Sequence, residues 1–540
     1  MNFLGKVLVL LLVVSLSGLD GAAAWADLPL DKMRETIEKG VDYLLSRQQP
    51  DGRWVYTANP GQYDVGMTAL CTLALAHTRL PKTTAAVQKG LAFITQQKPE
   101  PKTYTVGLVQ MLLFESGADR YNRLITLYGW MTVVSQQREG VGEGQWGYSL
   151  LSPTPGMKPG TVPPLPPGYA DHSNGQFGIL ALWYAARSGY QIPKRCWQRA
   201  KKHYERTQQP DGGWTYAVTP GRESTVSMTP ASTVSLYLAD EALAGYEKRH
   251  QCKMLPENPA IERGMKWVGD HKITWPAPYT WYAVERLGIL TGRSEFGGHN
   301  WMEDGAESLV RTDWTTEGHD PAANVAFAVL FLARALEPIV FNKLKRKGDW
   351  NNDRYDIKKL TEYISVKFQY PKQWRIVTLD ASVEELLKVP ILYTNGHEAL
   401  AFTDAEKAKL KAYVDRGGTI FGMACCGRKP FDKSFRALVA ELWPERKLEA
   451  LPKNHLIYTT PRPLAVKQTL LGMTDEKGRL AVIYSPYDMC CRWHTGASGA
   501  KAVYDVGANI YFYVSTTGVK LGGVREGYYI DTAKAPEPGR

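Results

Sequence analysis

Hydrophobic residues recur with the period of an α-helix along most of the first 340 residues. Within most consecutive pairs of such segments, the first is amphipathic and charged, and the second is apolar on nearly all sides, as in GMTALCTLALA at residues 66–76. A helix that is apolar on every side must be buried on every side, so we expect six inner helices surrounded by six outer ones. The pattern predicts helices at residues 31–47, 64–77, 82–96, 103–116, 119–136, 173–188, 193–207, 228–244, 257–270, 276–291, 301–311 and 320–336.

A seven-residue phrase occurs twice at the same place in this pattern. QQPDGRW at residues 48–54 and QQPDGGW at residues 208–214 each follow a charged helix and precede a more apolar one. Pro-Asp-Gly favours a turn, because proline presets φ, aspartate bonds locally and glycine accepts positive φ. A phrase repeated at a fixed structural place is typical of a repeat architecture. We predict that Trp54 and Trp214 are structural residues that lock the turn between an outer helix and the next inner helix.

The helix count, the pairing and the Gln-x-x-Asp-Gly-x-Trp phrases resemble the (α/α)6 toroid of terpenoid cyclases and protein prenyltransferases, which carry squalene cyclase-type repeats. Degenerate copies, QQREGVGEGQWGY at residues 136–148 and EFGGHNWMEDGAESL at residues 295–309, extend the resemblance over roughly residues 30–340. The Asp-x-Asp-Asp acid, the Asp-Asp-x-x-Asp magnesium site and the zinc ligands of those enzymes have no counterpart in this region. We therefore expect a toroid over residues 27–340 that binds an extended or hydrophobic ligand without those activities.

Polar residues gather just before the predicted inner helices, where the helix ends would form one mouth of the toroid. Helix capping explains Asp64, Asn174 and Asp320, because each stands just before an apolar run and Asp320 is followed by a proline, whereas Asp171 and His172 fit capping and a functional role equally. The alternative is a hydrolase, lyase or cyclase that acts on a glycan or lipid at this mouth. The ligand-binding candidates are Asp64, Asn174, His299 and Asp320, and the catalytic candidates are Asp171, His172 and His319, with Glu223 nearby in the pattern.

From about residue 341 the pattern changes to short apolar runs that alternate with amphipathic helices. We predict a charged connector at residues 341–360 and an α/β domain at residues 361–540. Strand alternating with helix predicts a mostly parallel sheet. The predicted strands include YISVKFQ, RIVTLD, PILYTNG, GTIFGMACCG, LAVIYS and GANIYFYVSTTG.

Two stretches of this part, LYTNGHEALAFTDAEKAKLKAYVDRGGTIFGMACCG and AVIYSPYDMCCRWH, resemble a family described as domain of unknown function 4159. That family is related in fold to class I glutamine amidotransferases, and the resemblance covers about residues 350–515. It implies a flavodoxin-like sheet and brings no established activity. In amidotransferases a nucleophilic cysteine lies on a strand-to-helix elbow, which Cys425 matches. The His-x-Glu partner is missing from residues 485–488, so His397 and Glu398 complete the catalytic candidates.

Adjacent cysteines occur at two predicted strand ends of the α/β domain. Cys425 and Cys426 follow one strand, and Cys490 and Cys491 follow another. Because the carboxyl ends of parallel strands share one edge of a sheet, we expect the two pairs to lie close together. A disulfide between the pairs, a metal site and free thiols remain open, with the disulfide preferred in an exported protein. No cofactor is expected from the motifs.

The N-terminus has the features of a secretory signal peptide. Lys6 precedes the apolar run VLVLLLVVSLSGL, and Ala24 and Ala26 form a small-residue cleavage pattern. We predict cleavage after residue 26 and export to the periplasm or the extracellular space. The apolar run is short for a membrane span, and no later stretch is long enough for one, so no transmembrane segment is expected after cleavage.

The formal net charge of +11 lies almost entirely in the C-terminal part. Residues 341–540 contain 32 Lys and Arg against 22 Asp and Glu. A basic domain usually suggests nucleic acid, but export argues against that partner. An anionic envelope polymer or a lipid remains a candidate partner for this domain, beside a basic surface that is merely solvated.

Overall fold

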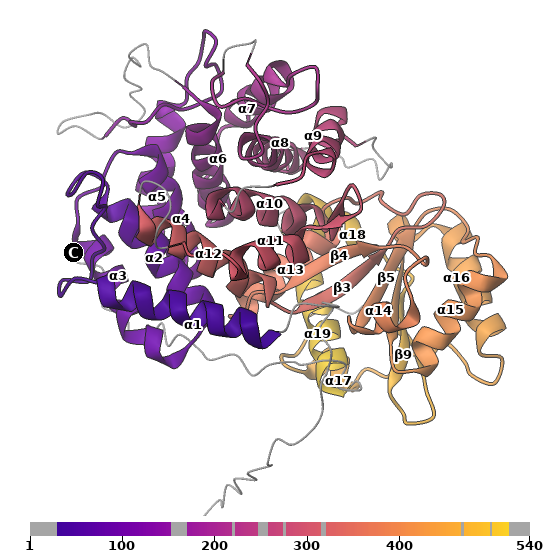
Figure 1. Ribbon diagram of the computed structural model, residues 1–540. Helices are drawn as coiled ribbons and strands as arrows, with labels where there is room; N and C mark the ends of the chain where they lie inside the picture. Colours follow the sequence, from indigo (N-terminus) through magenta and orange to yellow (C-terminus); the bar gives the residue numbers. More distant parts are fainter. Residues whose placement is uncertain are drawn as a thin grey trace, which may run out of the picture.

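The computed structural model describes residues 30–152, 170–218, 222–246, 257–273, 277–314, 320–465, 469–496 and 499–517, and Figure 1 shows its fold. The predicted signal peptide at residues 1–26 lies outside the described residues, as does His319. The described chain forms a helical region, up to about residue 337, and an α/β region beside it (Figure 1).

The helical region contains the twelve predicted helices, with ends that differ from the prediction by at most three residues. The predicted helix ends lie close to the observed ones because apolar residues recur with a strong helical period in this region. Two short strands, β1 (Glu295–Phe296) and β2 (His299–Asn300), form a hairpin before α11. The helices are α1 (Leu30–Arg47), α2 (Asp64–Thr78), α3 (Thr84–Gln96), α4 (Thr103–Glu115), α5 (Asn122–Ser135), α6 (His172–Arg187), α7 (Lys194–Thr207), α8 (Met228–Ala244), α9 (Pro259–Asp270), α10 (Pro278–Thr291), α11 (Trp301–Val310) and α12 (Pro321–Ala335).

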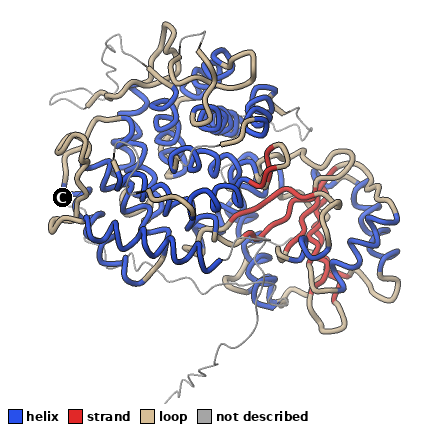
Figure 2. Tube along the Cα trace, viewed as in Figure 1, coloured by secondary structure: helices blue, strands red, loops and turns tan. Residues whose placement is uncertain are grey.

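The even-numbered helices form a closed circuit. Helix α2 packs on α4, and the contacts continue through α6, α8 and α10 to α12, which packs on α2. Each odd-numbered helix packs against this circuit, as α3 does on α2 and α7 on α8 (Figure 2). Helices α6 and α12 bury nearly all their residues, whereas α7 and α9 bury one face. The difference follows from their sequences, because only the apolar helices can be surrounded.

The turn at residues 48–54 is fastened to three helices. The indole N–H of Trp54 donates to Leu44 O of α1 at 2.8 Å, and its backbone N–H donates to Thr68 Oγ1 of α2 at 2.9 Å. Gln48 Nε2 donates to Ala86 O of α3 at 2.9 Å. Gly52 has φ +94°, and a Cβ there would lie 2.4 Å from a backbone oxygen, so only glycine fits the turn.

The turn at residues 208–214 repeats these contacts one by one. Trp214 donates through its indole to Tyr204 O at 3.0 Å and through its backbone to Thr229 Oγ1 at 3.1 Å. Gln208 Nε2 donates to Ala260 O of α9 at 2.7 Å. Both tryptophans are fully buried. The repeated phrase therefore joins an outer helix, the next inner helix and the following outer helix.

The α/β region is built on one seven-stranded sheet in the order β4-β3-β5-β6-β9-β8-β7. The first five strands of this order are parallel, and β8 pairs antiparallel with both β9 and β7, so the sheet is mostly parallel as predicted. The strands are β3 (Ile339–Leu344), β4 (Gln373–Val377), β5 (Ile391–Gly396), β6 (Thr419–Ala424), β7 (Glu449–Ala450), β8 (Leu471–Thr474) and β9 (Leu480–Ser485).

Helices cover both faces of this sheet. One core includes Phe341 and Phe421 with residues of α13, α18 and α19, and the other includes Leu392 and Val482 with residues of α14, α15 and α16. Alternate strand residues point to opposite faces, which explains why neighbouring residues belong to different cores. The helices are α13 (Asp356–Lys367), α14 (Val383–Leu387), α15 (Asp404–Asp415), α16 (Lys429–Leu442), α17 (Leu456–Thr459), α18 (Cys490–Thr495) and α19 (Lys501–Thr517).

Three predictions for this region were wrong. The charged segment at residues 341–360 is not a connector, because most of β3 lies in it and β3 pairs with both β4 and β5. YISVKFQ lies mostly in α13 and GANIYFYVSTTG mostly in α19, not in strands. Both segments are rich in β-branched and aromatic residues, which favours a strand prediction. Their buried residues nevertheless recur at helical spacing once the flanking residues are included, as Ile357, Leu360 and Ile364 do.

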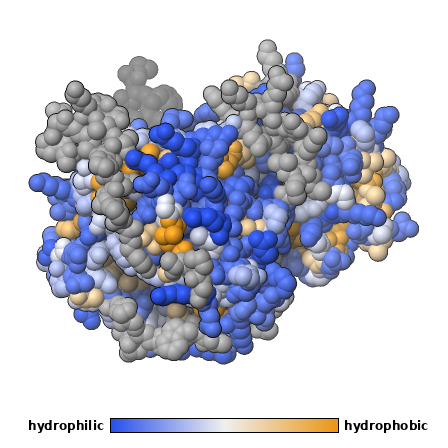
Figure 3. Space-filling model, turned by 90° about the horizontal axis from the view of Figure 1, so that it is seen from above, coloured by the Kyte–Doolittle hydropathy of each residue, from blue (hydrophilic) through white to orange (hydrophobic). Residues whose placement is uncertain are grey.

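The two regions are in direct contact. Lys358 of α13 forms an ion pair with Glu241 of α8 at 2.7 Å, and the guanidinium of Arg79 lies 3.9 Å from the ring centre of Tyr370. None of the described helices is long and apolar enough to cross a membrane. The face shown in Figure 3 is mostly hydrophilic, with small and separate hydrophobic areas.

Candidate functional site

Side-chain contacts join the N-terminal ends of α4, α6 and α10, and the loop before α2 bonds to the cap of α12; we call this end of the circuit the ring mouth. A chain of hydroxyl groups crosses it from helix to helix. Tyr104 of α4 bonds to Ser173 of α6, and Ser173 Oγ lies 2.9 Å from the hydroxyl of Tyr279 at the start of α10. Gln176 Nε2 donates to the same tyrosine hydroxyl at 3.0 Å. Neutral hydrogen-bonding groups therefore link these three helix ends.

More exposed tyrosines lie at the same end of the circuit. The hydroxyls of Tyr148 and Tyr216 lie 2.6 Å apart, and these two side chains belong to residues that are 44% and 38% exposed. Tyr56 and Tyr63 pack edge to face with ring centres 5.6 Å apart. Burial raises the pKa of Tyr279 to about 12, so its hydroxyl stays protonated near neutral pH. The ring mouth thus presents aromatic faces together with hydroxyl groups.

Asp171 and Asn174, predicted as a catalytic and a ligand-binding residue, bind each other. Asp171 precedes α6 and caps it, because Oδ1 accepts the backbone N–H of Asn174 at 2.7 Å and Oδ2 accepts its side-chain amide at 2.9 Å. Asn174 lies inside the first turn and is not itself the cap. Burial raises the pKa of Asp171, but both of its oxygens are held by the helix end. This arrangement is structural capping.

His172, the second catalytic candidate, is fully buried and held on both ring nitrogens. Nδ1 lies 2.7 Å from Thr215 O, and Nε2 lies 3.1 Å from Thr207 Oγ1 and 3.3 Å from His203 Nε2. Burial lowers the pKa of His172 to about 4 and also lowers that of His203. Both imidazoles are therefore neutral near pH 7. His203 was missed in the sequence because it lies on an outer helix.

The remaining predicted residues of the mouth are scattered. Asp320 caps α12 by accepting from Ala322 and Ala323, and its Oδ2 also accepts from Thr57 at 2.7 Å. Asp64 accepts the backbone N–H groups of residues 56 and 61, and so it holds the loop rather than capping α2. His299 is exposed in β2, where its ring lies 3.6 Å from the Asp304 carboxylate, and Glu223 is exposed before α8.

Glu100 is a polar residue of the mouth that the sequence did not single out. It lies just before α4, and its Oε1 is buried without a hydrogen-bond partner in the described part of the chain. Burial raises the pKa of Glu100 to about 7, and the neighbouring Asp64 acts in the same direction. A carboxyl group that titrates near neutral pH can serve as a general acid or base. No sequence motif marks it, because its pKa depends on burial.

A second cluster lies at the carboxyl edge of the sheet. Cys425 directly follows β6, Cys490 begins the helix after β9, and Asp353 lies in the loop after β3. Cys425 Sγ donates to Asp353 Oδ2 at 3.0 Å, and Cys491 Sγ lies 3.9 Å from Cys425 Sγ and 3.8 Å from Cys426 Sγ. The expected approach of the two cysteine pairs is therefore present. The sequence did not predict that Asp353 belongs to this cluster, because Asp353 lies within a loop and not at the end of a predicted strand.

The expected disulfide between the two cysteine pairs was wrong. Cys425, Cys426 and Cys490 are free, whereas Cys491 is disulfide-bonded and so has a partner other than these three. A disulfide bond requires the sulfurs to be about 2.05 Å apart, which the 3.8–3.9 Å separations exclude.

Cys425 and His397 lie close together, but Glu398 is not part of their contact. One ring nitrogen of His397 lies within 4.8 Å of the sulfurs of both Cys425 and Cys426. His397 Nδ1 lies 3.3 Å from Asp349 Oδ2, whereas the exposed Glu398 contacts that carboxylate only through its backbone N–H. The carboxylate beside His397 is therefore that of Asp349, and not that of the catalytic candidate Glu398. Asp349 was missed because it lies almost fifty residues upstream.

The thiols of this cluster are poor nucleophiles in their present surroundings. Burial raises the pKa of Cys490 well above its usual value, and burial and Asp488 raise that of Cys426. A hydrogen bond from Cys490 lowers the pKa of Cys425, but burial and the Asp353 carboxylate outweigh it and raise that pKa strongly. The thiolate is the reactive form of cysteine, so this environment disfavours amidotransferase-type catalysis.

Residues 340–514 match the model of a family described as "Domain of unknown function (DUF4159)". The match runs from β3 into α19 and so covers nearly all of the described α/β region. It supports the resemblance seen in the sequence of that region, whereas the helical region has no family match. No curated protein matches the chain.

Proposed function

We propose that the helical region is an (α/α)6 toroid of the kind found in terpenoid cyclases and protein prenyltransferases. The closed circuit of six inner helices and the packing of an outer helix beside each inner one support this assignment. The repeated turns support it as well, because each one links three successive helices through Trp and Gln. The toroid is proposed without the chemistry of those enzymes, since their acidic and zinc-binding motifs are missing from residues 27–340.

We further propose that the protein is exported and that its α/β region is an amidotransferase-like domain with a flavodoxin-like sheet. The parallel strands with helices on both faces support the domain assignment. The basic residue, apolar run and small residues at the N-terminus support export. The excess of Lys and Arg in residues 341–540 gives this domain a candidate surface for an anionic envelope polymer or lipid, and not for nucleic acid.

We propose that the protein binds an extended ligand at the ring mouth. The tyrosines of this end carry this proposal, because together they offer aromatic faces and hydroxyl groups. They are Tyr56, Tyr63, Tyr104, Tyr279 and the exposed pair Tyr148 and Tyr216. Tyrosine offers an apolar ring and a polar tip, which suits a ligand with both kinds of surface. A glycan strand of the cell envelope has this chemistry, with hydroxyl groups around apolar ring faces.

The groups that sequence analysis assigned to catalysis support binding more than turnover. Both oxygens of Asp171 are used in the helix cap, and both nitrogens of His172 have partners. A general acid or base must reach the substrate with a free lone pair or proton.

Binding to purified peptidoglycan tests this function directly. The full-length chain is incubated with insoluble peptidoglycan, and the bound fraction is measured after sedimentation. Replacing both Tyr148 and Tyr216 by Ala should weaken retention by about 10-fold, because two aromatic contacts are lost. Tyr487→Ala is the matched control, since Tyr487 is similarly exposed on the α/β region. If the double variant is retained as well as the unmodified protein, the ring mouth is not the binding surface. If the protein sediments with phospholipid vesicles but not with peptidoglycan, its ligand is a lipid and not a glycan.

An enzyme that acts at the same mouth is the second candidate, and Glu100 favours it. A glycan- or lipid-directed hydrolase, lyase or cyclase needs a carboxyl group that can be protonated near neutral pH, and burial gives Glu100 a pKa of about 7. If the chain releases soluble fragments from peptidoglycan, Glu100→Gln should abolish the release while leaving sedimentation unchanged. Release that persists in Glu100→Gln would exclude Glu100 as the acid.

A further inference from the structure

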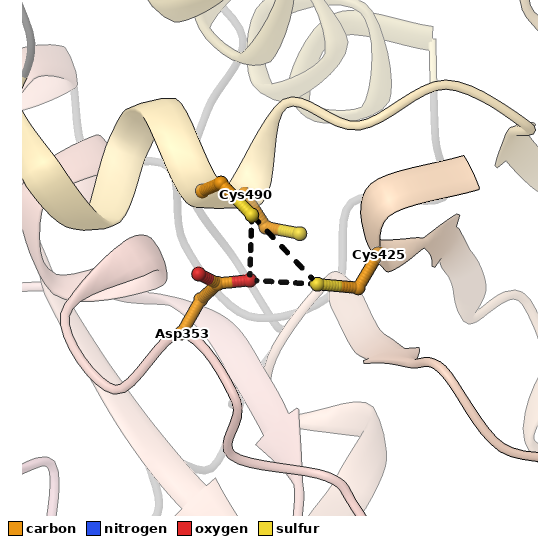
Figure 4. Close-up of side chains that lie close together, drawn as sticks. Asp353, Cys425 and Cys490 are labelled. Atoms are coloured by element: carbon orange, nitrogen blue, oxygen red, sulfur yellow. Dashed lines mark hydrogen bonds between the residues drawn. The ribbon is translucent and has the colours of Figure 1, made fainter. Parts of the chain in front are cut away.

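The strongest unassigned chemistry in the described chain lies at the carboxyl edge of the sheet, apart from the ring mouth. Asp353, Cys425 and Cys490 are each 0% exposed, and one ligand atom from each lies within 4.8 Å of the others. Figure 4 shows their side chains pointing toward one another from the loop after β3, the end of β6 and the start of α18. In α/β folds, ligands bind outside the carboxyl ends of the parallel strands.

We propose that Asp353, Cys425 and Cys490 bind one thiophilic divalent cation, of which Zn²⁺ is the model. Thiolates and carboxylates are established zinc ligands, whereas Mg²⁺ and Ca²⁺ prefer oxygen alone. Around a tetrahedral Zn²⁺, with Zn–S of about 2.3 Å and Zn–O of about 2.0–2.2 Å, ligand atoms stand roughly 3.5–3.8 Å apart. The 3.0 Å separation of Cys425 Sγ and Asp353 Oδ2 reaches this spacing with a small side-chain movement.

The backbone around the cluster is held so that the three side chains converge. Lys343 is buried in β3 and donates to Asp353 O at 2.9 Å and to Asp356 Oδ1 at 2.6 Å, which fixes the loop on which Asp353 lies. Asp488 Oδ1 accepts from the Cys490 thiol at 3.3 Å and from the backbone N–H of Cys491 at 3.1 Å. Such supporting contacts orient metal ligands.

The fourth coordination position is left for water or for Cys426. Cys491 is excluded as a thiolate ligand because its sulfur is already in a disulfide. Cys426 is exposed, and its sulfur lies within 4.8 Å of Cys425 Sγ and of a nitrogen of His397. Three protein ligands with an accessible fourth position are typical of zinc sites that can accept a further ligand. This inference concerns the α/β region and does not depend on what the ring mouth binds.

The test measures metal binding to the full-length protein, purified without chelators or thiol reagents. We expect one Zn²⁺ per chain by elemental analysis, and we expect Co²⁺ to give the intense absorption of a tetrahedral cobalt thiolate. Cys425→Ala and Cys490→Ala should lose the metal, and Asp353→Asn should weaken its affinity by at least about 10-fold. Cys71→Ala and Cys196→Ala are matched controls, because both are buried free cysteines of the helical region. These two control variants should keep one Zn²⁺ per chain.

A second measurement stays informative if a cysteine variant fails to fold. In the unmodified protein, Zn²⁺ should protect Cys425 and Cys490 from alkylation, as read by peptide mass spectrometry, but should not change the alkylation of Cys71 or Cys196. The site would be overturned if the protein bound neither Zn²⁺ nor Co²⁺. It would also be overturned if the control variants lost as much metal as the Cys425 and Cys490 variants. A disulfide between Cys425 and Cys490 in the freshly purified protein would also overturn it.

Discussion

At the ring mouth a chain of neutral hydroxyl groups links α4, α6 and α10, whereas at their C-terminal ends α2, α4, α10 and α12 meet through buried charges. His77 of α2 lies 2.6 Å from Glu115 of α4 and 3.1 Å from Glu337, which follows α12. Arg334 of α12 forms an ion pair with Glu285 of α10 at 2.9 Å. We call these five residues the ion cluster. Helices α4 and α10 carry groups of both kinds, hydroxyls at the mouth and charges at the opposite end.

The difference follows from what each end faces. The ion cluster lies near the junction with the α/β region, since Glu337 immediately precedes β3 and Arg79 stacks on Tyr370 there. Charges can be buried there because each one has an opposite partner. The ring mouth has exposed tyrosines instead. Neutral hydroxyls cost little to desolvate compared with charges, which fits the binding surface proposed for this end.

The two tryptophan turns link helices at the mouth end of the circuit, and replacing one of the tryptophans should have the largest effect on stability. Trp214→Ala should lower the free energy of unfolding by about 3–5 kcal/mol, because a fully buried indole leaves a cavity. Chemical denaturation of the full-length chain measures this loss. Trp214→Phe, which keeps a ring but loses the bond to Tyr204 O, should cost clearly less. An unchanged unfolding midpoint for Trp214→Ala would contradict the stapling role.

A cap at the mouth should matter less than a tryptophan. Asp320→Ala removes the acceptor for two N–H groups of α12 and for Thr57, so we expect a loss of about 1–2 kcal/mol. Asp320→Asn retains an acceptor and should recover part of that stability. Thermal unfolding of the three proteins side by side measures the difference. If the two variants are equally destabilised, the charge of Asp320 matters more than its capping bonds.

The ion cluster should make stability depend on pH through His77. Burial alone would lower the pKa of His77, but Glu115 and Glu337 outweigh it and raise the pKa above the ordinary 6.5. The stabilisation is therefore fully present below pH 6.5 and is lost as the pH rises through the folded pKa of His77. The slope should not exceed about 1.4 kcal/mol per pH unit for this proton.

Urea denaturation between pH 6 and 9 measures this slope. His77→Gln should flatten it, and His299→Gln should leave it unchanged, because His299 is exposed and outside the cluster. A slope that is the same in all three proteins would assign the pH dependence to other groups.

The smallest effect on stability is expected for the exposed tyrosines of the mouth. Replacing Tyr148 and Tyr216 by Phe removes one hydrogen bond between partly exposed hydroxyls, so the free energy of unfolding should change by less than about 0.5 kcal/mol. Retention on peptidoglycan should nevertheless fall if the hydroxyls contact the ligand. A loss of stability above 1 kcal/mol would show that this pair belongs to the framework and not to a binding surface.

The sequence by itself determined the twelve helices of the first region, because apolar residues recur there with a strong helical period. It also determined the two tryptophan turns, since their chemistry is local and repeated. In the α/β region it predicted the parallel sheet and the approach of the cysteine pairs from the order of strands and helices. It missed α13 and α19, where aromatic and β-branched residues concealed the helical spacing.

Only the tertiary structure decided which polar groups act together. Asp353 meets Cys425 across 72 residues, and Asp349 replaces Glu398 beside His397 across 48 residues. Folding also decided the roles of Asp171 and Glu100. The carboxylate of Asp171 caps a helix, and burial raises the pKa of Glu100. Hydrophobic periodicity is a local property of the chain, whereas a site is made by the separations and burial that packing imposes on distant residues.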